Sequence, residues 1–418
     1  MYIKRNYEKA ITAVSTSFPC IVVYGPRQVG KSTVIDHLFG ERFRKITLDD
    51  GEDRALALQN PKRFLELNPW PVIIDEIQKA PNLLDEIKKT IDEQRLLWLK
   101  SGERRQLMYI LTGSNRFELQ EGISESLAGR CGVIEMSSFS MAEKSGKEGI
   151  PFNPEIESLI SRERIFPKAY RTRPEIFEDI FLGGMPDIVT GESERNAYFR
   201  SYLSTYIEKD VSKLINAGME LQFRNFLSLL ALRTAQELHY DVLANSVGID
   251  TRTCKRWISI LETSGLIFLL QPYMPNMSSR IIKAPKLYFM DTGFCAYLCK
   301  WPDAEMLENC AMSGAFFETF VVSEMVKNFY ANNIDPKEYL FYYRDIDQKE
   351  IDILFVRRGE IYPIEIKKGI FPKNPTKNFG VLSKFGMEIK TGLIIDTCDR
   401  IRPANDVSYY YPVSLLGL

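Results

Sequence analysis

The sequence predicts an α/β protein of two or three domains whose first domain is a doubly wound parallel sheet. The length of 418 residues exceeds that of one ordinary domain. Apolar runs at 21–24, 45–48, 72–75, 108–111 and 133–136 alternate with helical stretches, a pattern typical of a parallel sheet covered by helices. A helix–turn–helix pattern follows near residues 240–263, and strands return in the last quarter.

Composition narrows the class of protein. The chain is 45% hydrophobic and 26% charged, as in soluble globular proteins. It lacks both an apolar run of about 18 residues, the length a membrane helix needs, and a signal-type start. Seven scattered cysteines without a Cys-x-x-Cys pair favour reduced thiols and a cytoplasmic location. A net charge of −1 excludes a generally basic nucleic-acid coat, so any such contact must come from local patches.

The strand at 21–24 leads into a phosphate-binding loop. The segment "GPRQVGKST" has the spacing Gly-x-x-x-x-Gly-Lys-Ser between a predicted strand and a predicted helix. Its backbone N–H groups and the following helix N-terminus are suited to hold phosphates. We expect ATP to bind there, with Lys31 reaching the β- and γ-phosphates and Ser32 binding Mg²⁺. The expected nucleotide-binding residues are Gly25, Pro26, Arg27, Gln28, Val29, Gly30, Lys31, Ser32 and Thr33.

The strand at 72–75 ends in two carboxylates. A phosphate loop needs a second Mg²⁺ contact from a neighbouring strand end, and Asp75 is suited to that role. Glu76 follows it and is expected to act as the general base on the attacking water.

Two further residues of the first domain are candidates for the same site. After the strand at 108–111, Asn115 is expected to hold the water or contact the γ-phosphate, with Ser114 as the rival. Turn chemistry alone also accounts for Gly-Ser-Asn. Arg130, before the strand at 133–136, is expected either to face a nucleotide, its own or a neighbour's, or to form a structural salt bridge.

The middle of the chain predicts a winged helix. In its second helix Cys254, Trp257, Ile258 and Leu261 form a core stripe at helical spacing. The exposed face is basic, as contact with the major groove requires. Two later strands form the expected wing. The expected DNA-binding residues are Arg252, Lys255 and Arg256 on the helix and Arg280 and Lys283 in the wing. The alternative is a packing or dimerisation module.

The last quarter places four charged residues in predicted apolar elements. Glu318 lies in a helix, Asp352 in one strand, and Glu365 and Lys367 on one face of the next. This order resembles the motif of PD-(D/E)xK nucleases. That resemblance implies that Asp352 and Glu365 hold a Mg²⁺ ion, that Lys367 positions the attacking water, and that Glu318 binds water or metal. The alternative is an inherited fold whose charges pair with one another.

The motifs "GPRQVGKST", "DEIQKAP", "LTGS" and "LAGR" together resemble a prokaryotic and archaeal family of AAA-type P-loop ATPases. The resemblance extends to "FLGGMPDIV" and to a helix that ends in Lys209-Asp210. This pair either contacts nucleotide across a domain or subunit interface or is an ordinary pair on the helix surface. It implies ATP and Mg²⁺ as cofactors.

The expected domains are a P-loop AAA-type ATPase domain at 1–145, a linker and helical junction at 146–200, a winged helix at 201–300 and a restriction-endonuclease-like α/β domain at 301–418. The linker is expected at 145–155, "SGKEGIPFNPE".

The sequence leaves two functions open. One is an ATPase that acts on double-stranded DNA, with cleavage by the last domain undecided. The other is an ATP-dependent switch that binds a protein partner and never cleaves; a homo-oligomer is also open.

Overall fold

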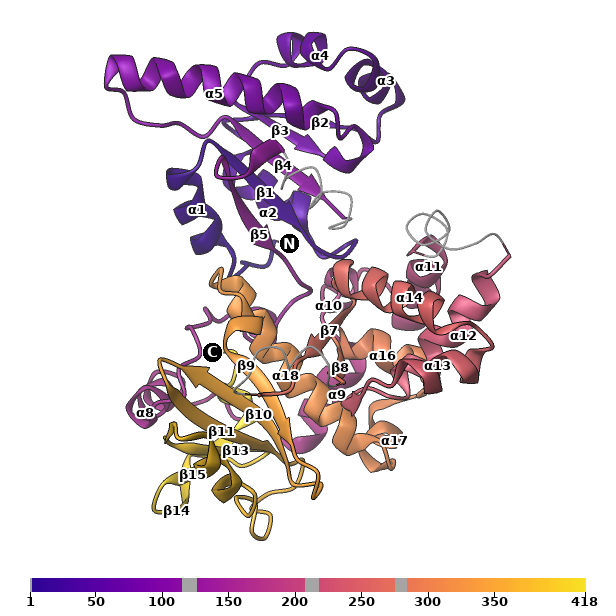
Figure 1. Cartoon of the computed structure of the whole chain (residues 1–418), viewed down its shortest axis with the longest axis vertical. Helices are drawn as coiled ribbons and strands as arrows, with labels where there is room; N and C mark the ends of the chain where they lie inside the picture. Colours follow the sequence, from indigo (N-terminus) through magenta and orange to yellow (C-terminus); the bar gives the residue numbers. More distant parts are fainter. Residues whose placement is uncertain (1, 115–125, 207–217, 275–283) are drawn as a thin grey trace.

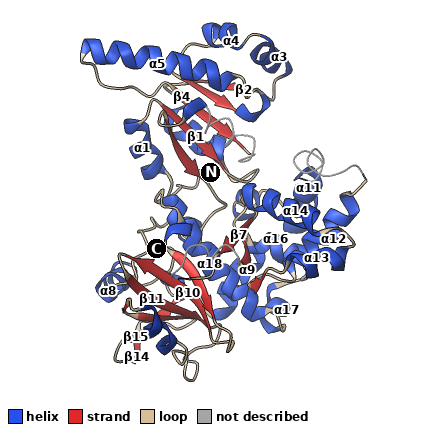
Figure 2. Ribbon diagram, viewed as in Figure 1, coloured by secondary structure: helices blue, strands red, loops and turns tan. Residues whose placement is uncertain are grey.

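The computed structural model describes residues 2–114, 126–206, 218–274 and 284–418. It has an N-terminal unit built on a parallel sheet, a mostly helical middle unit and a C-terminal unit built on a mixed sheet (Figures 1 and 2). The long helix α18 lies between the middle and C-terminal units in this view (Figure 1). Asn115, Lys209, Asp210, Arg280 and Lys283 lie outside the described residues.

The N-terminal sheet has the strand order β2-β3-β4-β1-β5 with parallel pairing throughout. The prediction of a parallel sheet is confirmed, and each predicted strand lies within two residues of its observed position. The elements of this unit are α1 Glu8–Ser17, β1 Cys20–Tyr24, α2 Lys31–Phe39, β2 Arg44–Thr47, α3 Gly51–Gln59, α4 Pro61–Leu67, β3 Val72–Asp75, η1 Ile77–Lys79, α5 Leu83–Ser101, β4 Tyr109–Gly113, β5 Cys131–Glu135 and α7 Met141–Lys144.

The middle unit surrounds a small antiparallel sheet of order β6-β8-β7. Its helix α14 buries the predicted stripe of Cys254, Trp257, Ile258 and Leu261, and Asp250 caps its N-terminus. Helix α9 packs against α16 and α17. Helix α8, Ile156–Ile165, precedes this unit in the chain and lies beside the C-terminal sheet (Figure 1). The elements of the middle unit are α9 Arg173–Leu182, α10 Pro186–Val189, α11 Arg195–Tyr206, α12 Glu220–Ala231, β6 Gln236–Glu237, α13 Tyr240–Val247, α14 Thr251–Thr263, β7 Ile267–Leu270, β8 Lys286–Phe289, α16 Thr292–Leu298 and α17 Ala304–Asn309.

The C-terminal sheet has the order β14-β15-β13-β11-β10-β9, and β12 pairs with β11. Strands β10 and β11 are antiparallel neighbours, which brings the Asp352 and Glu365 segments side by side. The elements are α18 Ser313–Ala331, η4 Pro336–Glu338, β9 Leu340–Arg344, β10 Glu350–Arg357, β11 Glu360–Ile366, η5 Phe379–Phe385, β12 Glu388–Ile389, β13 Gly392–Asp396, β14 Arg402–Asn405, β15 Ser408–Pro412 and η6 Val413–Leu415.

Helix α18 joins the three units because it packs against β5, β8 and β11, one strand from each sheet. It is apolar on most of its surface, and a single cluster of buried side chains runs from Tyr7 to Leu418 through it. It also buries the ion pair Glu324–Lys327, with 3.0 Å between Nζ and Oε1. Glu324 accepts from the Met141 N–H and Lys327 donates to the Phe139 carbonyl, so the helix holds the chain just after β5.

The segment at 145–155, predicted as a linker, packs on the C-terminal unit together with α8. The guanidinium of Arg162 is buried and donates to the carbonyl oxygens of Ile150, Pro151 and Leu416. The Phe152 N–H donates to Asn328 of α18. This part of the chain therefore has defined partners although its sequence shows weak periodicity. Within the described ranges, no helix is both long and apolar enough to cross a membrane.

Candidate functional site

The phosphate-binding loop follows β1 and opens directly into α2, as its spacing predicts. Gly30 has a φ of 89°, and a Cβ at Gly25 would come within 1.9 Å of the Met136 carbonyl oxygen. Both positions therefore require glycine. The buried Lys31 donates from Nζ to the carbonyl oxygens of Gly25, at 3.0 Å, and Pro26, at 2.7 Å. The loop thus presents its backbone and an ammonium group at the N-terminus of a helix, the arrangement that holds phosphate groups.

The loop is supported from behind by Arg5, a residue that the sequence did not single out. Its guanidinium donates to the Val29 carbonyl at 2.7 Å, to the Ser137 carbonyl at 2.8 Å and to Glu143 at 2.9 Å. Only 3% of Arg5 is exposed. A planar fork of donors can satisfy several acceptors at once. Arg5 therefore ties the loop to the end of β5 and to α7.

Two carboxylates lie opposite the loop at the end of β3. The Ser32 hydroxyl lies 3.0 and 3.1 Å from the two oxygens of Asp75, which also accepts from Thr112 of β4. Hydroxyl and carboxylate oxygens are the donors that Mg²⁺ prefers, so this pair fits the ion that a P-loop nucleotide carries.

The predicted base, Glu76, has a left-handed φ of 60° and is held by hydrogen bonds. Ser114 Oγ donates to Glu76 Oε2 at 3.2 Å, and Gln78 Nε2 donates to the same oxygen. Ser114, the weaker of the two alternatives at the strand end, is thus in contact with the base, and Asn115 lies outside the described residues. The structure therefore brings Ser32, Asp75, Glu76 and Ser114 to one edge of the sheet.

A cavity of about 320 Å³ lies over the loop. Residues of the N-terminal unit line most of it, and Tyr202 and Thr205 of α11 line the rest. The lining residues are Arg27, Gln28, Gly30, Lys31, Ser32, Thr33, Glu76, Tyr202 and Thr205. Helix α11, which leads toward Lys209-Asp210, therefore reaches the cavity through Tyr202 and Thr205.

Arg130 is not among the residues that line this cavity. Its guanidinium forms a two-point pair with Asp92 of α5, at 2.7 and 2.8 Å. The hydrogen bond from Arg130 lowers the pKa of Asp92. Of the two alternatives for Arg130, the structure contains the salt bridge.

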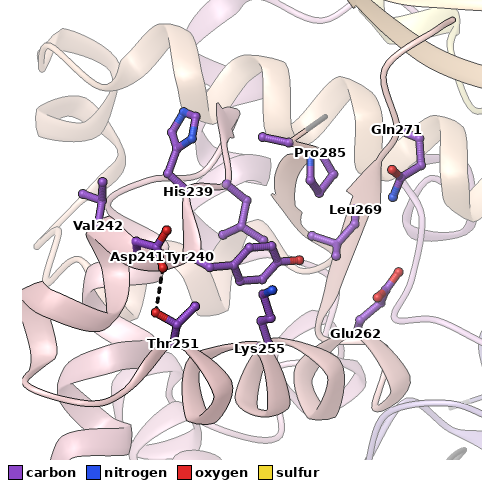
Figure 3. A pocket seen from close by; sticks show the side chains of 12 residues that line it. His239, Tyr240, Asp241, Val242, Thr251, Lys255, Glu262, Leu269, Gln271 and Pro285 are labelled. Atoms are coloured by element: carbon purple, nitrogen blue, oxygen red, sulfur yellow. Dashed lines mark hydrogen bonds between the residues drawn. The ribbon is translucent and has the colours of Figure 1, made fainter. Parts of the chain in front are cut away.

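The helix α14 exposes Arg252, Lys255 and Arg256 on the side away from its buried stripe. Beside it lies an open cleft of about 790 Å³ between α14, the start of α13 and the sheet. Figure 3 shows Lys255 extending from α14 toward the ring of Tyr240. The Nζ atom of Lys255 lies 5.5 Å from the centre of this ring. His239 and Gln271 also line the cleft. The exposed side of α14 and the cleft beside it therefore combine cations, an aromatic ring and polar side chains.

The four predicted charges of the C-terminal unit do come together. Lys367 Nζ lies 2.7 Å from Glu365 Oε1 and 3.7 Å from Asp352 Oδ2. The Ile366 N–H donates to Asp352 at 2.7 Å. The Oε2 atom of Glu365 is buried and has no hydrogen-bond partner among the described residues.

A fifth charge, which the sequence did not single out, lies among them. Lys286 of β8 places its ammonium 2.9 Å from Glu318 Oε1, 2.5 Å from Glu350 Oε1 and 4.0 Å from Asp352 Oδ1. Tyr288, on the same face of the strand, donates to Glu318 at 2.6 Å. We call Glu318, Glu350, Asp352, Glu365, Lys286 and Lys367 the charge cluster.

Burial controls the acidities in the charge cluster. Burial raises the pKa of Glu318 to about 7, and the nearby Asp352 carboxylate adds to this rise. The same two causes raise the pKa of Glu365 to about 7. Burial alone would lower the pKa of Lys286, but the charges around it raise that pKa well above its ordinary value.

In the part of the chain that the structure describes, no three His, Cys, Asp or Glu side chains are arranged to hold a metal ion. The predicted metal role of Asp352 and Glu365 therefore does not fit this arrangement, because an ammonium group lies among the carboxylates.

Comparison with family models divides the chain into three matches. Residues 17–144 match an AAA domain. Residues 173–305 and 313–416 match two domains of unknown function, DUF8612 and DUF4143.

Related proteins were found in bacteria and archaea. An uncharacterized protein of Mycobacterium tuberculosis is 25% identical over 357 residues, which are 85% of this chain and 71% of the relative. An uncharacterized protein of Methanocaldococcus jannaschii is 25% identical over 296 residues, which are 65% of this chain and 60% of the relative. A solved Walker-type ATPase of Pyrococcus abyssi is 14% identical with a TM-score of 0.43, covering 71% of this chain and 96% of that one. From the AAA match, the phosphate loop and the parallel sheet together, the N-terminal unit is a P-loop ATPase-like domain.

Proposed function

We propose that this protein binds ATP with Mg²⁺ between the phosphate-binding loop and helix α11, and hydrolyses it. The observation that carries the proposal is the cavity lined by Lys31, Ser32, Thr33 and Glu76, all of them at the carboxyl edge of a parallel sheet. Ligands of open α/β sheets bind at this edge.

Each residue has a defined task in this proposal. Lys31 and the N-terminus of α2 hold the phosphates, while Ser32 and Asp75 hold Mg²⁺, which neutralises phosphate charge when bound. Glu76 takes the proton from the attacking water at its Oε1 atom, and Ser114 fixes the other carboxylate oxygen through its hydroxyl. Thr112 holds Asp75 in place.

The test compares ATP turnover and nucleotide binding in three variants. Lys31→Ala is expected to lose both ATP turnover and nucleotide binding. Glu76→Gln is expected to bind ATP but to hydrolyse it at least about a hundredfold more slowly than wild type. Lys45→Ala, which removes a lysine on the exposed side of β2, serves as the matched control. Normal turnover by Glu76→Gln would assign the base elsewhere, and normal turnover by Lys31→Ala would end the proposal.

A second function, binding of double-stranded DNA by the middle unit, is favoured by the exposed basic face of α14. The order α12, β6, α13, α14, β7, β8 with the sheet order β6-β8-β7 supports a winged helix. In such a module the second helix of the pair contacts the major groove. The cleft beside α14, with Lys255, His239 and Tyr240, offers room for the nucleic-acid backbone.

The DNA proposal is tested by reversing the charge of Arg252, Lys255 and Arg256 together. Duplex affinity is expected to fall, and the slope of log affinity against log salt to shrink by about 0.9 for each lost phosphate contact. Reversal of Lys100, Arg104 and Arg105, three exposed cations in and after α5, changes the net charge equally and is the control. Unchanged affinity would favour the alternative, an ATP-dependent switch with a protein partner.

Cleavage of DNA by the C-terminal unit is not part of this function. The charge cluster contains the predicted Asp352, Glu365 and Lys367, but Lys286 lies among its carboxylates. In this proposal the C-terminal unit serves as a packing partner of the middle unit, which it contacts through Lys286.

A further inference from the structure

Gln78 lies beside the proposed catalytic base and belongs to the same tight turn of the chain. Strand β3 ends at Asp75, Glu76 has a left-handed φ of 60°, and the short helix η1 follows from Ile77 to Lys79. This change of backbone direction brings the side chain of Gln78 back to the carboxylate of Glu76. Glu76 is among the residues that line the cavity over the phosphate-binding loop, and Gln78 is not. Gln78 therefore contacts the base from outside the cavity.

Gln78, Glu76 and Ser114 form a closed set of hydrogen bonds. Gln78 Nε2 donates to Glu76 Oε2 and lies 3.3 Å from Ser114 Oγ, which itself donates to Glu76 Oε2 at 3.2 Å. An amide nitrogen carries two hydrogens, a hydroxyl carries one and an ionised carboxylate carries none. Because the hydroxyl hydrogen goes to Glu76, the two amide hydrogens go to the carboxylate and to the hydroxyl oxygen. Two donors therefore hold Oε2 of Glu76, which leaves Oε1 to take a proton.

The orientation of the Gln78 amide leaves its own carbonyl oxygen unpaired. This Oε1 atom is buried and finds no hydrogen-bond partner in the described part of the chain. The opposite orientation would set the carbonyl oxygen against the Glu76 carboxylate, two acceptors with no hydrogen between them. The nitrogen therefore faces Glu76, although an unpaired buried acceptor costs free energy. A side chain that served only the fold would gain by pairing both ends, so this orientation indicates a task at Glu76.

We propose that Gln78 is a positioning residue for ATP hydrolysis, which holds Glu76 by Oε2 so that Oε1 takes the proton of the attacking water. This inference rests on the proposed function and extends it by one residue. As the water oxygen bonds to the γ-phosphorus, its proton passes to Glu76, and the bond from that phosphorus to the bridging oxygen breaks, which yields ADP and phosphate. A carboxylate held by one oxygen keeps the other directed at the water during this step.

The test compares Gln78→Met with wild type in the full chain. Methionine has a similar length but lacks both donors, and the measured quantities are kcat for ATP with Mg²⁺, ATP affinity and melting temperature. The kcat value is expected to fall at least about tenfold, because a misplaced catalytic group loses up to about a hundredfold in rate. ATP affinity and melting temperature are expected to change little, since Gln78 lies outside the cavity and one end of its amide is already unpaired.

The same change on a Glu76→Gln background separates positioning from a structural role. If Gln78 acts through the Glu76 carboxylate, Glu76→Gln/Gln78→Met hydrolyses ATP as slowly as Glu76→Gln alone, so that the two losses do not add. A structural role predicts a further loss in the double variant. Gln59→Met, at the exposed end of α3, is the matched control and is expected to leave all three quantities unchanged. If Gln78→Met does not fold, Gln78→Ala, which adds no bulk, carries the test.

Two results would overturn the role of Gln78 and leave the proposed function standing. One is normal turnover by Gln78→Met while Glu76→Gln is slow. The other is an equal loss of turnover from Gln78→Met with and without the Glu76 carboxylate. Normal turnover by Glu76→Gln would assign the base elsewhere and end this inference with it, and absence of ATP turnover in wild type would end the proposed function as well.

Discussion

Arg5 shows how a residue outside the phosphate-binding loop can support it. Its three donors reach Val29, Ser137 and Glu143, and its guanidinium lies 4.5 Å from the centre of the Phe139 ring. We expect Arg5→Ala to cost about 3–5 kcal/mol of unfolding free energy, because it leaves Glu143 buried without its ion partner. Denaturant unfolding measures this, with the exposed Lys4→Ala as control.

The companion substitution Arg5→Lys distinguishes charge from geometry. It keeps the charge but lacks the planar fork, so the Val29 and Ser137 carbonyls cannot both be held. ATP affinity is expected to fall although Lys31 is intact, and a fluorescent nucleotide titration checks this. If Arg5→Lys binds ATP like wild type, Arg5 supports the fold and not the loop.

The raised acidities of the charge cluster predict the pH dependence of stability. Glu365 has a pKa of about 7 in the folded protein, raised by burial and by Asp352 and opposed by Lys367. As the pH rises, the unfolded chain therefore releases the proton of this glutamate near its ordinary pKa of about 4.3, whereas the folded protein keeps the proton up to about pH 7. The pKa of Glu318 is also raised to about 7, although Lys286 and Tyr288, which face its carboxylate, oppose the rise. Their stabilising contribution is present below about pH 4.5 and is lost as the pH rises through about 7.

Glu365→Gln tests this sign. It is expected to flatten the dependence of melting temperature on pH between about 4.5 and 7 and to gain most relative to wild type above pH 7. Glu360→Gln, at the partly exposed start of the same strand, is the control, since its pKa is lowered by contacts with Tyr362 and Lys390. Parallel profiles for wild type and Glu365→Gln would contradict the assignment.

At the scale of elements, α11 of the middle unit contributes Tyr202 and Thr205 to the cavity in which we propose that ATP binds. Thr205→Arg should fill this cavity with a long side chain and reduce ATP affinity by at least about tenfold, or 1.4 kcal/mol. Ser201→Arg, on an exposed position one turn earlier, should leave affinity unchanged. Both variants should melt like wild type. Normal ATP binding by Thr205→Arg would show that α11 stands clear of the ligand.

Elements with a local signal could be predicted from the sequence. Buried strands such as Val72–Asp75 are short apolar runs, and the phosphate loop carries its glycines and lysine in one segment. The buried stripe of α14 could be predicted because its apolar residues recur at helical spacing in the sequence. Asp352, Glu365 and Lys367 were also found together, since β10 and β11 are consecutive and antiparallel.

Residues that act across units, or between segments of one unit that are far apart in the sequence, could not be predicted in this way. Lys286 and Tyr288 lie two apart in a predicted strand, which places them on one face, but nothing local indicates that Glu318 and Glu350 lie opposite. Arg5 meets Glu143 across 138 positions, and Tyr202 reaches the loop through packing of α11. Such contacts depend on how whole units pack, which local periodicity does not contain.

At the scale of the whole molecule, contacts of α18 with β5, β8 and β11 couple the three units. We expect Glu324→Ala to destabilise the protein by about 3–5 kcal/mol, because Lys327 and the Met141 N–H lose their partner. Calorimetry should show one shifted transition for all units, with the exposed Glu338→Ala as control. Separate transitions, with the N-terminal one unmoved, would mean that the units unfold independently.

The same helix has a consequence for synthesis on the ribosome. The Phe139 carbonyl and the Met141 N–H are made long before Glu324 and Lys327, the α18 side chains that satisfy them. At about 5–20 residues per second, the interval between residues 141 and 327 lasts roughly 10–40 s. During that time the nascent first unit exposes both polar groups and the apolar surface that α18 later covers. The last quarter of the chain therefore completes the N-terminal unit, and premature termination before α18 would release that unit without the helix that covers it.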